Sequence, residues 1–165
     1  MAKLLYMLLL LTSFIFGGTF LLKPNEKLIF GFKSKSGKVV TIALGPKKSY
    51  LVYRFGKKNC VEFEYPKDKK NSFSKFSYYH YMRPSLGNTN AGLDINDLSF
   101  TNKGYTYTVY DEYSDEGGHS IGVKVFKGEK EIATIKGLVK SKKGTLLTIE
   151  DLIENDGLPI KYKED

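Results

Sequence analysis

The chain has 165 residues, of which 41% are hydrophobic and 27% are charged. This length suits one ordinary domain, and the composition is globular, which excludes disordered and collagen-like proteins. The 26 Lys and Arg against 18 Asp and Glu give a formal charge of +8, and the single cysteine, Cys60, excludes an intramolecular disulfide and a multi-cysteine zinc site.

The first residues have the pattern of an export signal. Lys3 precedes the uncharged apolar run Leu4–Phe16, which the small residues Gly17, Gly18 and Thr19 follow. A charged start, a short apolar stretch and a small-residue exit are typical of a secretory signal peptide. We therefore predict a helical signal peptide over residues 1–22, export to the periplasm or the extracellular space, and a single domain over residues 23–165.

The same segment leaves an alternative open. Taken as a whole, Leu4–Leu22 approaches the roughly 20 apolar residues that span a bilayer, and no A-x-A-like triplet marks a cleavage site. An uncleaved segment would make the protein a membrane-anchored structural component of the envelope, and only in that case do we expect membrane contact. In an oxidising compartment a lone thiol is expected to be buried, so Cys60 is predicted to lie in the interior.

The remainder of the chain is predicted to form strands. Short runs rich in β-branched and aromatic residues alternate with Gly, Pro, Asn and Lys clusters, a spacing typical of a sandwich or barrel. The predicted strands are Lys27–Lys33, Val39–Leu44, Ser49–Phe55, Cys60–Tyr65, Lys75–Met82, Ile95–Thr101, Tyr105–Tyr113, Ser120–Phe126, Glu131–Lys136 and Thr145–Ile149. The connections are too short for crossover helices, so we expect an all-β, single antiparallel meander, either a barrel or a sandwich. One helical turn is predicted at Glu150–Asn155.

One segment imitates a hydrolase motif. Gly118–Gly122 fits G-x-S-x-G, but a polar loop precedes it and a strand pattern follows, whereas a nucleophile elbow needs a strand and then a helix. His80 and His119 both precede Ser120, against the order of α/β-hydrolases. We therefore predict no catalytic residues, and an enzyme that uses these three side chains is the weakest hypothesis.

An acidic cluster raises the question of a metal. It consists of Asp111, Glu112, Asp115, Glu116 and His119. Calcium and zinc sites draw on such side chains, but the spacing of a calcium-binding EF-hand loop is absent. A solvated hairpin loop is the favoured interpretation, and we predict neither a metal nor a cofactor.

Two aromatic segments indicate a binding surface. In Phe73–Arg83 rings alternate onto both strand faces, and the pattern recurs in Tyr105–Tyr113. Tyrosine and arginine are enriched at binding hot spots, although tyrosines can also simply fill the wall of a β-domain. The predicted binding residues are Tyr78, Tyr79, His80, Tyr81, Arg83, Tyr110 and Tyr113.

The positive charge and the expected export limit the classes of binding partner. Lysines gather in predicted turns, where they protect sheet edges and attract anionic polymers or lipid surfaces. We expect an exported, non-enzymatic binding protein whose partner is an envelope glycan, a protein or an anionic surface. A basic aromatic face also suits single-stranded nucleic acid, which export disfavours as a functional ligand.

Taken together, the segments SYLVYRFG, FSYYHYMR and GYTYTVYDEY resemble small exported all-β proteins of bacteria that carry no assigned role. The resemblance covers most of the predicted domain and implies no catalytic or binding residues. The architecture is also similar to that of periplasmic lysozyme-inhibitor barrels. This chain differs from them because it lacks a disulfide pair and is basic, so its charge would oppose association with a basic lysozyme.

Overall fold

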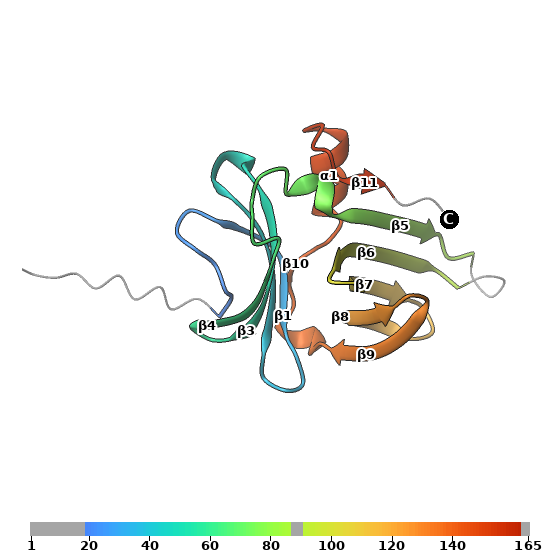
Figure 1. Ribbon diagram of the computed structural model, residues 1–165. Helices are drawn as coiled ribbons and strands as arrows, with labels where there is room; N and C mark the ends of the chain where they lie inside the picture. The colour runs from blue at the N-terminus through green and yellow to red at the C-terminus, as the bar shows by residue number, and fades with distance from the viewer. Residues whose placement is uncertain (1–18, 87–90, 163–165) are drawn as a thin grey trace, which may run out of the picture.

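The computed structural model describes residues 19–86 and 91–162, which form two β-sheets and one short helix (Figure 1). The first sheet has the strand order β10-β1-β2-β3-β4 and the second has the order β11-β5-β6-β7-β8-β9. The elements are β1 (Lys27–Lys33), β2 (Val39–Leu44), β3 (Leu51–Lys57), β4 (Cys60–Tyr65), β5 (Ser77–Arg83), β6 (Leu93–Asn102), β7 (Tyr105–Ser114), β8 (Gly118–Lys127), β9 (Lys130–Lys136), β10 (Lys143–Gly144), α1 (Thr148–Glu154) and β11 (Lys161–Tyr162). The all-β prediction is confirmed.

The strands form two meanders instead of the single one predicted. Consecutive strands pair as antiparallel hairpins from β1 to β4 and again from β5 to β9. Between these runs the chain passes from the first sheet to the second, over residues 66–76. The terminal strand β11 then joins the second sheet parallel to β5, which is a further departure from the predicted antiparallel order.

The two sheets face one another, and the strands of one run across those of the other (Figure 1). A bridge between Ser34 and Gly137 joins them at one corner, but the described strands do not close into a ring. The barrel alternative is therefore wrong for the described residues, and the arrangement is that of a sandwich.

The predicted strand Thr145–Ile149 is also wrong, because the chain turns into α1 there. Leu146 and Ile149 are fully buried and Leu152 is 4% exposed. These three residues recur at the spacing of one helical face, so a helical turn buries all of them while a strand would expose alternate ones. The helical turn predicted at Glu150–Asn155 belongs to this helix.

A single hydrophobic core lies between the sheets. The first sheet contributes Phe30 and Tyr53, the second contributes Tyr78 and Phe100, and all four are at most 3% exposed. The rings of Tyr53 and Phe100 lie 5.0 Å apart across the interface. Burial of these aromatic faces is the main force that holds the sheets together.

Cys60 is exposed, contrary to the prediction that a lone thiol is buried. It follows a two-residue turn in which Asn59 adopts a φ of 64°, and it pairs with Lys57 at the tip of the β3–β4 hairpin. The position of the turn thus decides the exposure of this residue, because a hairpin tip projects away from the core.

The chain before β1 covers the outer face of the first sheet. The Phe20 ring lies over Gly31, where a Cβ atom would come within 2.7 Å of it. The Leu21 amide donates to Thr41 Oγ1 at 3.1 Å, and Leu21 itself is 8% exposed. This cover explains why every residue of β2 is buried, on both faces of the strand.

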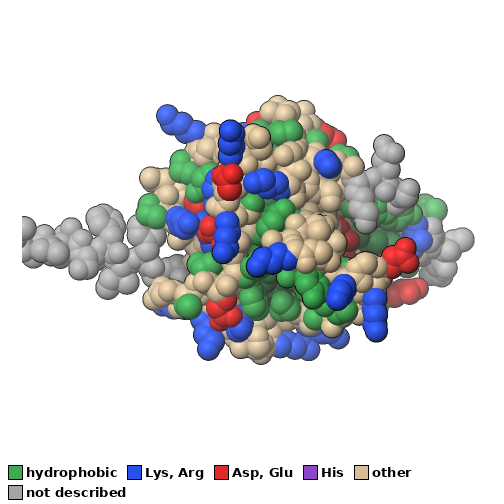
Figure 2. Space-filling view, in the orientation of Figure 1, with side chains coloured by type: hydrophobic (Ala, Val, Ile, Leu, Met, Phe, Trp, Pro, Cys, Tyr) green, Lys and Arg blue, Asp and Glu red, His purple; other side chains and the backbone are tan. Residues whose placement is uncertain are grey.

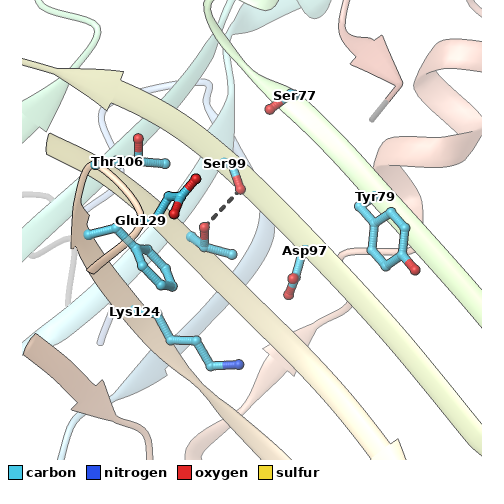
Figure 3. Close-up of a pocket in the computed structure, with 10 residues that line it drawn as sticks. Ser77, Tyr79, Asp97, Ser99, Thr106, Lys124 and Glu129 are labelled. Atoms are coloured by element: carbon cyan, nitrogen blue, oxygen red, sulfur yellow. Dashed lines mark hydrogen bonds between the residues drawn. The ribbon is translucent and has the colours of Figure 1, made fainter. Parts of the chain in front are cut away.

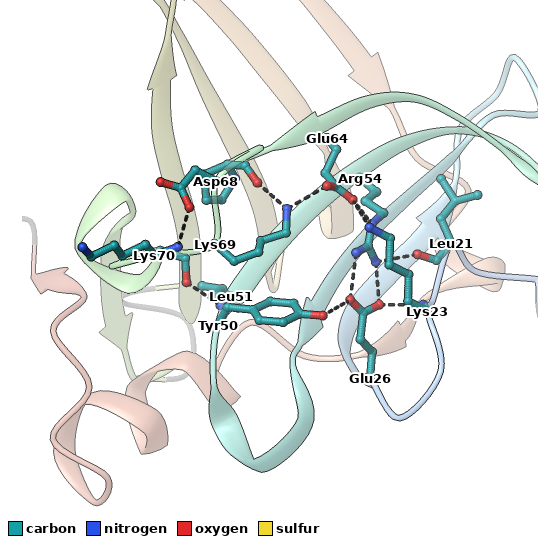
Figure 4. Close-up of polar contacts among 12 residues, drawn as sticks. Leu21, Lys23, Glu26, Tyr50, Leu51, Arg54, Glu64, Asp68, Lys69 and Lys70 are labelled. Carbon is teal, nitrogen blue, oxygen red and sulfur yellow. Dashed lines mark hydrogen bonds and ion pairs between the residues drawn. The ribbon is translucent and has the colours of Figure 1, made fainter.

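A buried ion pair holds this cover in place (Figure 4). Arg54 on β3 donates to both carboxylate oxygens of Glu26 at 2.6 and 2.8 Å, to Glu64 at 2.5 Å and to the Leu21 carbonyl at 2.9 Å. The side chains of Arg54 and Glu26 are both 0% exposed. Such forked contacts satisfy several guanidinium donors at once, which offsets the cost of removing the charges from water.

The surrounding donors keep both carboxylates ionised. Burial raises the pKa of Glu26, but hydrogen bonds from Arg54, from the Lys23 amide and from Tyr50 outweigh it and hold the pKa below its ordinary value. At Glu64 burial acts in the same direction, and the contacts with Lys69 and Arg54 lower the pKa to about 2. The guanidinium therefore faces two anions at neutral pH.

None of the described helices is long and apolar enough to cross a membrane. The predicted signal segment Leu4–Phe16 lies outside the described residues, so its helical form stays a prediction.

Replacement of Arg54 by Met should lower the free energy of unfolding by ~3–5 kcal/mol, because Glu26 then remains buried without its cation. The double variant Arg54→Met/Glu26→Met should recover most of this loss, since it removes both charges. Urea unfolding of the two variants measures the difference. Lys38→Met serves as the control, because its ion pair with Glu62 is partly exposed and should contribute at most ~1 kcal/mol. Equal loss in the single and double variants would contradict the assigned role of the pair.

Candidate functional site

The register of the second sheet sorts its side chains onto two faces. Tyr78, Leu98, Val109 and Val123 pair in one row, and all of them point into the core. Their neighbours along each strand point the other way, because successive residues of a strand alternate between faces. We call the second set the outer face.

The outer face carries hydroxyl, carboxylate and aromatic groups in ordered rows. One row runs across β5 to β9 through Ser77, Ser99, Thr108, Lys124 and Thr134. The adjacent row consists of Tyr79, Asp97, Tyr110, Gly122 and Lys136. Residues that are directly opposite on paired strands lie close enough for their side chains to act together.

A groove of about 620 Å³ lies on this outer face (Figure 3). It is lined by Ser77, Tyr79, Asp97, Ser99, Thr106, Thr108, Lys124, Phe126, Gly128 and Glu129. In Figure 3 Asp97 lies between Tyr79 and Lys124, while Glu129 comes from the β8–β9 turn. We refer to this feature as the hydroxyl groove, because four of its side chains are Ser or Thr.

The polar groups of the hydroxyl groove are held by neighbouring contacts. The Ser99 and Thr108 hydroxyls are hydrogen bonded at 2.9 Å, from β6 to β7. The Lys124 ammonium binds the Glu112 carboxylate at 3.0 Å and lies 4.7 Å above the centre of the Tyr110 ring. Burial lowers the pKa of Lys124, but the Glu112 contact outweighs it and raises the pKa, so the lysine is charged at neutral pH.

A glycine within β8 shapes the floor beside the hydroxyl groove. A Cβ atom on Gly122 would meet the Tyr110 hydroxyl at 2.4 Å and the Ile135 carbonyl at 2.5 Å. The absence of a side chain lets the Tyr110 ring lie flat across β8, where it is 6% exposed beneath Lys124. Burial raises the pKa of Tyr110, so its hydroxyl remains protonated.

The structure divides the predicted binding residues between the two faces of the sheet. Tyr79, Tyr81, Arg83 and Tyr110 belong to the outer face, whereas Tyr78, His80 and Tyr113 belong to the inner face. Among the outer residues, Tyr79 lines the hydroxyl groove, Tyr81 is 37% exposed and Arg83 donates to the Ala91 carbonyl at 3.1 Å. The seven residues therefore do not form one surface.

On the inner face, polar side chains join neighbouring strands of the second sheet and connect it to α1. His80 contacts Asp94 at 3.3 Å and Glu150 of α1 at 3.0 Å. The buried Tyr78 hydroxyl donates to Asn96 at 2.6 Å, and Tyr113 packs edge-on against His119. The His80–Glu150 contact ties α1 to the sheet, and the other contacts join neighbouring strands within it.

A second ionic cluster on the inner face holds the segment before β10. Asp111 Oδ1 is bound both by His119 at 2.7 Å and by Lys142 at 2.8 Å, and the Asp111 side chain is 3% exposed. Glu112, its neighbour in sequence, points to the outer face. The acidic cluster noted in the sequence is thus split between the faces, and within the described residues no group of three or more His, Cys, Asp or Glu side chains is placed to hold a metal ion.

The hydrolase-like motif lies within a strand. Ser120 is on β8, paired with Glu112, to which its hydroxyl donates at 3.3 Å. His119, the residue before Ser120, points to the inner face, where it binds Asp111. Ser120 is therefore not on the strained turn that presents a nucleophile in α/β-hydrolases.

The hydroxyl groove was missed in the sequence, apart from Tyr79. Ser77, Ser99, Thr106 and Thr108 are separated by up to 31 positions in the chain and have ordinary strand-surface character. The signal that could have found them is the spacing of hydroxyl residues at every second position within neighbouring predicted strands, such as Thr106 and Thr108.

The positive charge is dispersed over the surface. Figure 2 shows lysine and arginine side chains scattered over that side of the molecule, with acidic side chains among them. The basic character of the chain therefore does not form a single continuous patch on the side shown.

Comparison of the chain with protein-family models, with curated proteins and with solved structures gives no match.

Replacement of Gly122 by Ala should displace the Tyr110 ring and lower the free energy of unfolding by ~1–3 kcal/mol, as overpacking does. Urea unfolding measures the loss, and near-ultraviolet circular dichroism reports the tyrosine environment. Ser120→Ala, two positions earlier on the same face of β8, is the control and should leave both unchanged. Unaltered stability and dichroism in Gly122→Ala would contradict the packing described.

Proposed function

We propose that this protein is an exported, non-enzymatic binding protein of the cell envelope or the extracellular space, and that the hydroxyl groove binds a glycan. The observation that carries the proposal is the lining of the groove: four hydroxyl side chains, the Asp97 carboxylate and the Tyr79 and Phe126 rings share one open surface. Its volume of about 620 Å³ lies within the range of ordinary ligand sites.

The chemistry of a sugar matches this lining. Hydroxyl side chains both donate and accept hydrogen bonds, and a carboxylate accepts several, so together they complement a ligand that carries many hydroxyl groups. The C–H face of a sugar ring is apolar and packs against an aromatic ring such as that of Tyr79. A groove for an apolar ligand would instead be lined mainly by hydrophobic side chains.

Export is supported by the sequence pattern of Leu4–Phe16. An exported protein encounters envelope glycans. The expected export and the polar lining of the groove therefore favour the same kind of ligand. The membrane-anchored alternative keeps the same groove and differs in whether Leu4–Leu22 is retained.

Fractionation of expressing cells tests the localisation. We expect soluble exported protein whose intact mass lacks roughly the first twenty residues, because a signal peptide is removed after translocation. Full-length protein in the membrane fraction would instead support the anchor, and full-length protein in the soluble cytoplasmic fraction would contradict export.

Variants of the hydroxyl groove test the binding site. Calorimetric titration with a panel of soluble envelope oligosaccharides should show binding to the wild type, and Asp97→Asn and Tyr79→Ala should each weaken it by about tenfold, since each removes one principal contact. Asp94→Asn and Tyr113→Ala are the matched controls, because they make the same changes on the inner face. Both should retain wild-type affinity.

Two results would contradict the proposal. The first is unchanged affinity both in the triple variant Tyr79→Ala/Tyr81→Ala/Arg83→Ala and in the separate variant Asp97→Asn. This result would place the ligand outside the hydroxyl groove. The second concerns hydrolysis, because Asp97 and Glu129 both line the groove and glycosidases act through a pair of carboxyl groups. Mass spectrometry of the oligosaccharides after incubation with the protein tests for it. Shortened products would show hydrolysis and overturn the non-enzymatic part.

A further inference from the structure

A second groove, of about 400 Å³, lies where β8 and β9 meet the β1–β2 turn. Its wall is built by a contact between the sheets, in which the Lys35 amide donates to the Lys136 carbonyl at 3.0 Å. This backbone bond brings two lysines from different sheets to the same opening. We refer to it as the lysine groove.

The lysine groove has an excess of positive charge. Lys35, Lys124 and Lys136 line it, against Glu112 as the one carboxylate among its lining residues. Glu112 is bound to Lys124 at 3.0 Å, and no ion pair joins Lys35 or Lys136 to another described residue. Lys35 and Lys136 thus line the opening without an ion pair of their own among the described residues.

The two grooves share a boundary. Lys124 lines both of them, and the Tyr110 ring lies beneath its ammonium group on the side of the lysine groove. Asp97, Tyr110, Gly122 and Lys136 also follow one another in a single row across the sheet. A ligand longer than one sugar can therefore contact the hydroxyl groove and the lysine groove at once.

We infer that the lysine groove is a subsite for anionic substituents, so that the ligand of the hydroxyl groove is an acidic glycan. This inference rests on the proposed function. Lysine presents a compact charge on a flexible stem, without the planar fork by which arginine selects a carboxylate or a phosphate. The subsite should therefore recognise negative charge on the glycan with little preference for the geometry of the acid.

Matched pairs of oligosaccharides test the inference by calorimetry on the purified protein. The first pair is a peptide-free peptidoglycan tetrasaccharide, which carries lactyl carboxylates, and chitotetraose, which lacks them. The second is tetragalacturonate and its methyl ester, which share a backbone and differ in charge. We expect the acidic member of at least one pair to bind about tenfold more tightly at low salt, and the advantage to shrink as salt is added.

The double variant Lys35→Gln/Lys136→Gln should remove the preference for the acidic member and leave the affinity for the neutral one unchanged. Lys47→Gln/Lys70→Gln is the control, since it removes the same charge from exposed loops at the opposite end of the first sheet. This control should keep most of the preference.

Three results would overturn the inference while the proposed function stands. They are equal affinity for both members of each pair, a preference that survives in Lys35→Gln/Lys136→Gln, and displacement of the acidic glycan by inorganic phosphate at equal concentration, which would indicate a site for free anions. Absence of binding by every oligosaccharide would overturn the proposed function and this inference together.

Discussion

The first sheet depends on the buried contact between Arg54 and Glu26. Without it, the segment around Leu21 would have no charged anchor, and the outer face of β2 would lie open to water. A fully buried guanidinium is tolerated because two carboxylates and a carbonyl satisfy its donors. The consequence is that the outer side of β2 is covered, whereas the outer face of the second sheet carries the open hydroxyl groove.

That outer face obtains its character from the core beneath it. Once Leu98 and Val109 are fixed in the interior by the opposing sheet, Asp97 and Thr108 must point outward, because a slip of one residue would exchange the two sets. Packing of the core therefore determines where the hydroxyl groove lies. The side chains at the outward positions determine its chemistry.

The sequence predicts the strands far better than it predicts what they assemble. The alternation of residue types along Tyr105–Tyr113 correctly places Val109 and Thr108 on opposite faces, because the two-residue period of a strand can be read from a single segment. The cover over β2 could not be foreseen, since the pairing of Arg54 with Glu26 joins residues that no local pattern relates. The same applies to the candidate site, where hydroxyl residues from β5, β6 and β7 meet only through register.

The aromatic residues show why a conspicuous composition is a poor guide to a site. Tyr78 and Tyr110 were singled out together, yet one fills the core and the other lies beneath Lys124 on the opposite face. Tyr110 lies beside the grooves because Gly122 has no side chain. A Cβ atom at that position would meet the Tyr110 hydroxyl. The boundary between the hydroxyl groove and the lysine groove is thus shaped by a glycine. Its positive charge comes from Lys124 and Lys136 of the second sheet and from Lys35, which the contact between the sheets adds.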